Sequence, residues 1–283
     1  MKKVLVTGAG GQLGQCFQKQ AEQFPDLEFV FATSEMFDLT LTSVMDVYLR
    51  ERNFDYCINC AAYTNVEQAE THREMAFHVN ADGVKHLAKA CRDNGVTLIH
   101  FSTDYVFDGG KRAVYSEEDE TNPINIYGGS KLMGEECIRQ EMEEYFIFRT
   151  SWLYSDIGHN FYNTIRKKAE SGEALNITTE QVGTPTNAHD LARFVLQLIS
   201  DGSTAFGLYH YSNLGEATWY DFAAEILSLT GYSDKVELKE NNSFATVAKR
   251  PAYSVLAKEK AVKAFGQEIL PWKESLARLV KRV

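Results

Sequence analysis

The chain has 283 residues, of which 44% are hydrophobic and 24% are charged, a composition typical of a soluble globular protein. Its 29 basic and 39 acidic side chains leave a formal net charge of −10, which disfavours broad binding to nucleic acid or to an anionic membrane. The apolar run near the N-terminus covers only residues 4–6, and no stretch approaches the roughly 20 apolar residues of a membrane span. We therefore expect no signal peptide, no membrane segment and a cytoplasmic location.

Short apolar segments alternate with helical patterns through the first half of the chain. Strands are predicted at 4–6, 29–32, 56–60, 98–101 and 146–148, and helices at 12–24, 44–52, 75–94 and 127–144. This alternation predicts an α/β fold with a doubly wound, parallel, Rossmann-like sheet. The strands are almost continuously apolar, as expected when helices cover both faces of the sheet.

The pattern loosens after residue 150, where long polar segments separate the apolar ones. Helices are predicted at 161–171, 190–200, 219–230 and 272–281. We predict a dinucleotide-binding domain at 1–150 and a smaller C-terminal substrate-binding lobe at 151–283, with 188–200 as a segment able to pack back on the sheet. Because open α/β sheets bind ligands at the carboxyl ends of their strands, we expect the lobe to close over that edge.

A glycine-rich turn directly follows the first predicted strand. Gly8, Gly11 and Gly14 have the spacing G-x-x-G-x-x-G. Such a turn lets the backbone approach a pyrophosphate, and the helix that follows offers free N–H groups and the positive end of its dipole. Gly14 would also allow the helix to pack closely against the sheet. The turn therefore predicts a dinucleotide site.

The end of the second predicted strand bears on the choice of cofactor. The strand ends at Thr33, without the Asp or Glu that holds the ribose 2′-hydroxyl of NAD. A missing carboxylate removes repulsion against a 2′-phosphate and favours NADPH, but no arginine lies there, so NADH stays open. Asp38 and Leu39 flank the adenine in one interpretation. In the other, Asp38 caps a helix near Thr40 and Thr42.

Tyr127 and Lys131 lie four residues apart in a predicted helix and therefore share one helix face. Thr103 and Asp104 follow the strand predicted at 98–101. A free tyrosine has a pKa near 10, so we expect the Lys131 ammonium and a positively charged nicotinamide ring to favour the ionised phenol. Tyr127 would then act as an acid or base, with the Thr103 hydroxyl bound to the substrate oxygen.

The five cysteines show no disulfide-like spacing. Cys57 and Cys60 have the spacing of half a zinc site, but they lie in a predicted strand, where positions three apart point to opposite faces. We therefore expect both to be core residues, and no metal site.

Several motifs together resemble the extended short-chain dehydrogenase/reductase family, and within it the dTDP-4-dehydrorhamnose reductases. The resemblance covers essentially the whole chain, and its specificity comes from the joint order of the motifs. They are the turn at 8–14, the segments 61–64 and 102–107, Asn80, Tyr127 with Lys131, and the segments 148–154, 158–161, 181–186 and 250–251.

The resemblance implies NAD(P)H-dependent reduction of the 4-keto group of dTDP-4-dehydro-L-rhamnose to dTDP-L-rhamnose. It makes Tyr127 the proton donor, whereas Lys131 lowers the pKa of Tyr127 and holds the nicotinamide ribose, and Thr103 tunes the pair. The implied cofactor residues are Gly8, Gly11, Gln12, Leu13, Gly14, Thr33, Asp38, Leu39, Ala62, Tyr63, Thr64, Tyr127 and Lys131. The implied substrate residues are Thr103, Asp104, Trp152 and Arg250.

Alternatives stay open for single residues. Trp152 could be an apolar plug between the lobes, Asp104 a turn cap, Arg250 a surface charge, and Asn80 a bridge between backbone groups rather than a substrate ligand.

Alternatives stay open for the whole chain as well. A nucleotide-sugar epimerase or dehydratase of the same superfamily would use tightly held NAD without net consumption. A non-catalytic NADP-binding subunit would resemble the regulatory β subunit of methionine adenosyltransferase. A homodimer is one possible assembly.

Overall fold

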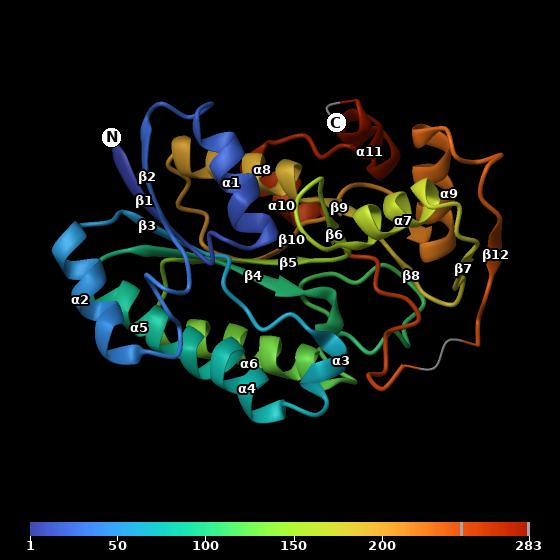
Figure 1. Cartoon of the computed structure of the whole chain (residues 1–283). Coiled ribbons are helices and arrows are strands. Elements are labelled where there is room, and N and C mark those ends of the chain that lie inside the picture. The colour runs from blue at the N-terminus through green and yellow to red at the C-terminus, as the bar shows by residue number, and fades with distance from the viewer. Residues whose placement is uncertain (244–245, 282–283) are drawn as a thin grey trace.

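A six-stranded parallel sheet runs through the centre of the molecule, with the strand order β2-β1-β3-β4-β5-β10 (Figure 1). The structure is a computed structural model that describes residues 1–243 and 246–281. The strands of the sheet are β1 Lys2–Thr7, β2 Leu27–Ala32, β3 Tyr56–Asn59, β4 Thr97–Thr103, β5 Tyr145–Thr150 and β10 Gly207–His210. The predicted parallel α/β sheet is confirmed.

Helices cover both faces of this sheet because successive side chains of each strand point to opposite sides. Val4 and Val6 pack in the core that includes α1 and α8, whereas Leu5 packs in the core that includes α2, α5 and α6. The helices concerned are α1 Gln12–Ala21, α8 Ala188–Ser200 and α10 Glu259–Phe265 on the first face, and α2 Thr42–Arg52, α5 Val84–Asp93 and α6 Ile126–Glu141 on the second. Cys57 belongs to the second core and Cys60 packs against the first, which confirms that they point to opposite faces.

The helix predicted at 75–94 is interrupted. It consists of α4 Arg73–Phe77, a π-helical turn at His78–Gly83, and α5. In this turn the Asn80 side chain accepts from the backbone N–H of Tyr63 (2.8 Å) and donates to the Tyr63 carbonyl (2.9 Å) and to Ser130 Oγ (2.9 Å). The interpretation of Asn80 as a bridge between backbone groups is confirmed. Single π turns within α-helices are common beside functional sites.

Two parts of the second half return to the sheet. Helix α8 packs against α1, and β10 pairs with β5 in parallel, from Gly207 with Phe146 to His210 with Arg149. A return of the segment 188–200 to the sheet was expected, whereas β10, a four-residue strand without a strong apolar pattern, was not predicted. The division into 1–150 and 151–283 stays a prediction, and β10 shows that the sheet draws on both parts.

The remaining C-terminal elements form a lobe with a core of its own, around Phe222 and Trp272. Helix α9 begins with a capping box between Thr218 and Asp221 and is capped at its C-terminus by Gly231, whose φ of 75° suits glycine. The elements of the lobe are α7 Phe161–Glu170, α9 Trp219–Thr230, α11 Trp272–Val280, β6 Leu153–Tyr154, β7 Leu175–Ile177, β8 Val182–Gly183, β9 Thr186–Asn187, β11 Ala217–Thr218 and β12 Leu238–Glu240. Short helical segments Val66–Ala69 (α3) and Asp104–Val106 follow β3 and β4. Along the described part of the chain, no helix is both long and apolar enough to cross a membrane.

Candidate active site

The glycine turn lies where the strand order reverses, between β1 and β3. Gly8 has a φ of 61°, and a Cβ there would lie 2.6 Å from the backbone nitrogen of Ala61, so only glycine fits. A Cβ at Gly14 would lie 2.5 Å from the Gly8 carbonyl oxygen, which explains how α1 approaches the turn so closely. Parallel sheets bind ligands at this kind of switch point, outside the carboxyl ends of the strands.

The start of α1 is open to an anion. Gly11 precedes the helix and provides no side-chain cap, so the first N–H groups of the helix lack a capping partner. A cavity of about 860 Å³ and a second of about 360 Å³ adjoin the turn, and Gly11, Cys60, Ala61 and Ala62 line both. This adjoining pair of cavities fits an extended dinucleotide bound across the turn.

Most residues expected at the site line one of these cavities. The larger cavity is lined by Gly11, Gln12, Leu13, Ala62, Thr64, Thr103, Asp104, Tyr127, Lys131, Trp152 and Arg250, and the smaller one by Gly8, Gly11, Thr33, Asp38, Leu39 and Ala62. Gly14 and Tyr63 line neither. They support the wall instead, Gly14 by packing on the turn and Tyr63 by its backbone bonds to Asn80.

Asp38 caps a turn rather than a helix. Its Oδ1 accepts from the backbone N–H and the hydroxyl of Thr40, both at 2.8 Å. Helix α2 begins at Thr42, after Leu41 and without a side-chain cap. The helix-cap interpretation was therefore wrong, because the carboxylate is used within the loop. Asp38 remains in the wall of the smaller cavity.

Tyr127 is half-buried in the wall of the larger cavity, close to Thr103 and Asp104. Burial raises the pKa of its phenol to about 12; the Thr103 hydroxyl lowers it, and the Asp104 carboxyl raises it further. The expectation that the Lys131 ammonium lowers this pKa is not met by the protein's own groups, because burial disfavours the phenolate more strongly. A raised pKa keeps the phenol protonated at neutral pH, the form that a proton donor requires.

Lys131 is buried beneath the same cavity. Its Nζ lies 3.2 Å from Nε2 of His100, in β4. Burial lowers the pKa of Lys131 to about 8, although Glu135 and Cys60 raise it. Lys131 therefore loses its charge around pH 8, well below the pH at which an exposed lysine does.

Asp104 is also buried. It accepts from the Ser254 hydroxyl (2.6 Å) and from Thr103 Oγ1 (3.2 Å), and thereby ties β4 to a C-terminal segment. Burial raises the pKa of Asp104 from 3.8 to about 7, despite the lowering effect of these hydrogen bonds. The carboxyl is therefore partly protonated near neutral pH.

We expect Asp104 to make the protein less stable as pH rises. Because its pKa is higher in the folded state, its contribution to the free energy of unfolding is complete below pH 3.8 and is lost as pH rises through about 7. Urea unfolding at about pH 5 and about pH 8 should show a larger loss for the natural protein than for Asp104→Asn, which keeps the bond to Ser254 but does not titrate. Equal losses would contradict the raised pKa.

Trp152 has a strained backbone at the cavity wall. Its φ is 45°, uncommon for a residue other than glycine. The indole stacks on Trp219 with ring centroids 3.6 Å apart, and a Cβ at Gly183 would lie 2.7 Å from its ring. Trp152 therefore both packs between segments of the lobe and faces the cavity, so neither interpretation of this residue excludes the other.

Arg250 lies at the same cavity and is ion-paired. Its guanidinium donates to Glu67 Oε1 (2.8 Å), and Glu67 Oε2 accepts from the backbone N–H of Val247 (2.9 Å). Among residues 1–243 and 246–281, Nε of Arg250 is buried without a hydrogen-bond partner. The side chain is only partly exposed, so it is not a free surface charge.

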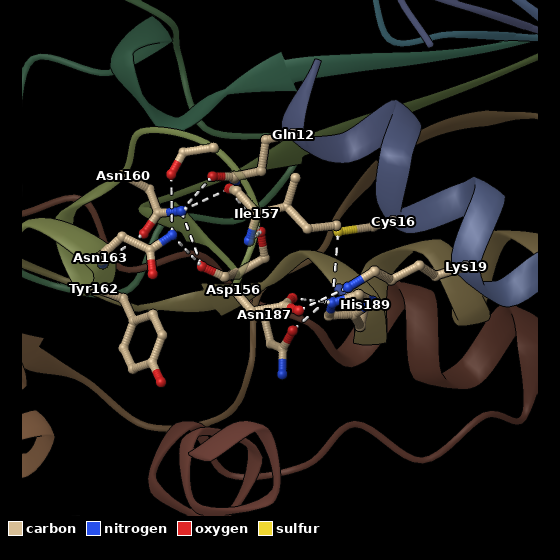
Figure 2. A network of polar contacts seen from close by, with 12 residues as sticks. Gln12, Cys16, Lys19, Asp156, Ile157, Asn160, Tyr162, Asn163, Asn187 and His189 are labelled. Carbon is tan, nitrogen blue, oxygen red and sulfur yellow. Dashed lines mark hydrogen bonds and ion pairs between the residues drawn. The ribbon is translucent and has the colours of Figure 1, made fainter. Parts of the chain in front are cut away.

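A polar network joins the start of α1 to the lobe, as Figure 2 shows. Gln12 accepts from Asn160 Nδ2 (2.8 Å), and Asn160 also caps α7 through the N–H of Asn163. Nearby, Asp156 pairs with His189 and with Lys19, each at 2.7 Å. The start of α1, next to the glycine turn, is thereby held against the C-terminal lobe.

Sequence reasoning missed several residues of this site. In the sequence, His100 and Asn59 stand out only as polar residues within strands that are largely apolar. Trp219 and Glu67 carried no local signal, since their partners are far away along the chain. In the part of the chain that the structure describes, no group of three or more His, Cys, Asp or Glu side chains is placed to hold a metal ion.

The parallel sheet, the glycine turn at its switch point and the Tyr127/Lys131 pair in the adjoining cavity define a Rossmann-type protein of the short-chain dehydrogenase/reductase class. A family model described as the RmlD substrate binding domain matches residues 1–283, and the chain belongs to this family.

Similar proteins agree with this assignment. A dTDP-4-dehydrorhamnose reductase of Sinorhizobium fredii is 39% identical, over 98% of this chain and 96% of that protein. The structure of a dTDP-4-dehydrorhamnose reductase from Clostridium acetobutylicum has a TM-score of 0.93 and 38% identity, and covers 99% of both chains. A Bacillus anthracis dTDP-4-dehydrorhamnose reductase in complex with NADP has a TM-score of 0.94 and 35% identity, and covers 100% of both chains.

Proposed function

We propose that this protein reduces the 4-keto group of dTDP-4-dehydro-L-rhamnose to give dTDP-L-rhamnose, with NADPH as the reductant. The observation that carries the proposal is the Tyr127 phenol, which lines a cavity that begins at the glycine turn and is kept protonated there by its raised pKa. The similar proteins that are named dTDP-4-dehydrorhamnose reductases align with almost the whole chain. Support for NADPH comes from the NADP complex of the Bacillus anthracis protein and from Thr33 at the end of β2.

Tyr127, Thr103 and Lys131 have different roles in the proposed reduction. NADPH, when bound, supplies the hydride to the sugar C4. The phenol of Tyr127 donates its proton to the C4 oxygen, and the Thr103 hydroxyl orients that oxygen. Lys131, one helical turn from Tyr127, would bind the nicotinamide ribose. Because the phenol is neutral in the resting site, no charge has to be buried before the reaction.

Other residues bind the two ligands. Gly11, Gln12 and Leu13 at the open start of α1 suit the pyrophosphate of the cofactor. Asp104 and Trp152 suit the sugar, since they present a carboxyl and an indole to the larger cavity. Arg250 suits the pyrophosphate of the substrate, which would compete with Glu67 for the guanidinium.

Cofactor choice provides a direct prediction. Thr33→Asp should weaken NADPH binding by at least about tenfold while NADH binding is retained, because the new carboxylate repels a 2′-phosphate and accepts from a 2′-hydroxyl. Fluorescence titration with both cofactors measures this. Thr42→Asp adds the same charge at an exposed position that lines neither cavity and should leave the ratio unchanged. An unaltered ratio in Thr33→Asp would place the 2′-phosphate elsewhere.

The activity itself is tested by NADPH oxidation with dTDP-4-dehydro-L-rhamnose, compared with UDP- and GDP-linked keto sugars. We expect one NADPH consumed per sugar reduced, and a preference for the dTDP-linked substrate. Product without net consumption of NADPH would indicate an epimerase or dehydratase. No turnover, together with stable co-purification of a partner enzyme, would indicate a binding subunit. A cytoplasmic location and a homodimer stay predictions.

A further inference from the structure

A row of buried polar side chains crosses the sheet and ends at Lys131. Thr7 Oγ1 donates to Asn59 Oδ1 (2.7 Å), Asn59 Nδ2 lies 3.0 Å from His100 Nδ1, and His100 Nε2 lies 3.2 Å from Lys131 Nζ. All four residues are at most 2% exposed. The register explains the row, because Thr7 pairs with Asn59 across β1 and β3, and Asn59 pairs with His100 across β3 and β4.

The direction of the hydrogen bonds in this row is fixed by the backbone. The N–H of Ala61 points to Asn59 Oδ1 (3.2 Å), and a backbone N–H only donates, so this atom of the side-chain amide is its oxygen. The amide nitrogen of Asn59 therefore faces His100 and donates to Nδ1. A neutral imidazole that accepts at Nδ1 carries its hydrogen on Nε2. His100 thus points an N–H at Lys131.

An N–H that points at Nζ favours the neutral form of the lysine. An ammonium group has three donors and no acceptor, whereas a neutral amine has a lone pair that accepts the Nε2 hydrogen. The imidazole does not gain a second proton, because burial, and then the Lys131 charge, lower the pKa of His100 well below its usual value. The 3.2 Å contact is therefore a hydrogen bond only while Lys131 is an amine.

We propose that His100 is a positioning residue, which holds Lys131 in place and favours its amine form through a hydrogen bond from Nε2 to Nζ, with Asn59 fixing the imidazole tautomer. This inference depends on the proposed function in one respect, which is that Lys131 binds the cofactor in the reductase site. Nothing in the reaction requires His100 to touch substrate or cofactor. His100 would affect the reaction only by changing the position and charge of Lys131.

Other ionisable groups surround Lys131 and act on its charge. Glu135 and Tyr127 lie on the same helix, α6, Cys60 follows β3, and Arg149 of β5 pairs with Glu135. Glu135 and Cys60 favour the ammonium. The variants that test the proposal must therefore change His100 or its tautomer and leave these groups intact.

The test follows the charge of Lys131 directly. In protein labelled with ¹³C at the lysine Cε, the Lys131 resonance is assigned by its loss in Lys131→Arg, and its shift is followed with pH. We expect a midpoint near 8 in the natural protein. His100→Asn keeps an acceptor for Asn59 but cannot reach Nζ, and should raise the midpoint by about half to one pH unit, the worth of one hydrogen bond.

Asn59→Asp changes the tautomer without removing the imidazole. A carboxylate still accepts from Ala61, but it must also accept from His100 Nδ1–H, which leaves Nε2 as an acceptor for the ammonium. Because the new charge also raises the Lys131 midpoint, the tautomer is read directly from the ¹⁵N shifts of the His100 ring, which should place the hydrogen on Nε2 in the natural protein and on Nδ1 in this variant. Hydrogen on Nδ1 in the natural protein would overturn the inference even if His100→Asn fails to fold. His210→Asn is the matched control, a buried histidine that contacts the carbonyl of Tyr115, and it should leave the midpoint unchanged.

An unchanged or lower midpoint in folded His100→Asn would also overturn the inference. The titration needs neither substrate nor cofactor, so its failure is distinct from failure of the proposed function. A shifted midpoint in a protein without reductase activity would overturn only the proposed function. As a second readout, the pH at which NADPH binding weakens should rise in His100→Asn and not in His210→Asn.

Discussion

Replacing Tyr127 with phenylalanine is expected to lower the turnover number by about 100- to 10,000-fold, the range for loss of a general acid. The substitution removes only the phenolic O–H, which the proposed reaction needs as the C4 oxygen gains its proton. The ring and its edge contact with Tyr105, at 6.1 Å between centroids, are retained. Cofactor binding should therefore be nearly unchanged. Steady-state NADPH oxidation and fluorescence titration with NADPH measure the two effects.

The control for this experiment is Tyr145→Phe, which removes a hydroxyl at the start of β5, outside both cavities. It should leave turnover and cofactor affinity as they are. An unchanged turnover number in Tyr127→Phe would refute the proton-donor role, and an equal loss in both variants would show that the effect is general.

Replacing Glu135 with leucine is expected to reduce the free energy of unfolding by about 3–5 kcal/mol. Glu135 and Arg149 are fully buried and form a two-point ion pair, with Nη2 to Oε2 at 2.7 Å and Nε to Oε1 at 2.9 Å. Removing the carboxylate leaves the guanidinium charge buried and unpaired, and it also removes the acceptor of the Ser102 hydroxyl. Urea unfolding monitored by circular dichroism measures the loss.

Two further variants separate charge from packing. Combining Glu135→Leu with Arg149→Met removes both charges and should recover much of the stability, because no buried charge is left alone. Arg92→Ala breaks an exposed pair with Glu141 and should leave the unfolding midpoint almost unchanged. Equal midpoints for Glu135→Leu and the natural protein would show that the buried pair contributes little.

Local patterns predicted the sheet well, because its strands and helices differ in apolar period and length. The expected strand at 98–101 lies within β4, and the expected helix at 219–230 matches α9. The π-helical turn around Asn80 was not predicted, since it depends on bonds to Tyr63 and Ser130. Strand β10 was not predicted because its four residues, Gly207–His210, have no strong apolar pattern.

The parts of the candidate site that were predicted correctly each lie within one short segment of the sequence. The glycine turn and the Tyr127/Lys131 pair have fixed spacings, which a helix or a turn converts directly into geometry. Charge states were harder to predict. A raised pKa for Tyr127 and a lowered one for Lys131 both follow first from burial, which no local pattern reports.

The sequence by itself determined the parallel α/β sheet, the dinucleotide turn and the Tyr127/Lys131 pair, since each depends on residues a few positions apart. Only the tertiary structure decided that His100 faces Lys131, that Trp219 stacks on Trp152, and that Glu67 holds Arg250. These partners lie tens to hundreds of positions apart and are brought together by strand register and by packing of the lobe. These contacts form only when the whole chain folds, because each partner is held by a different helix, strand or loop.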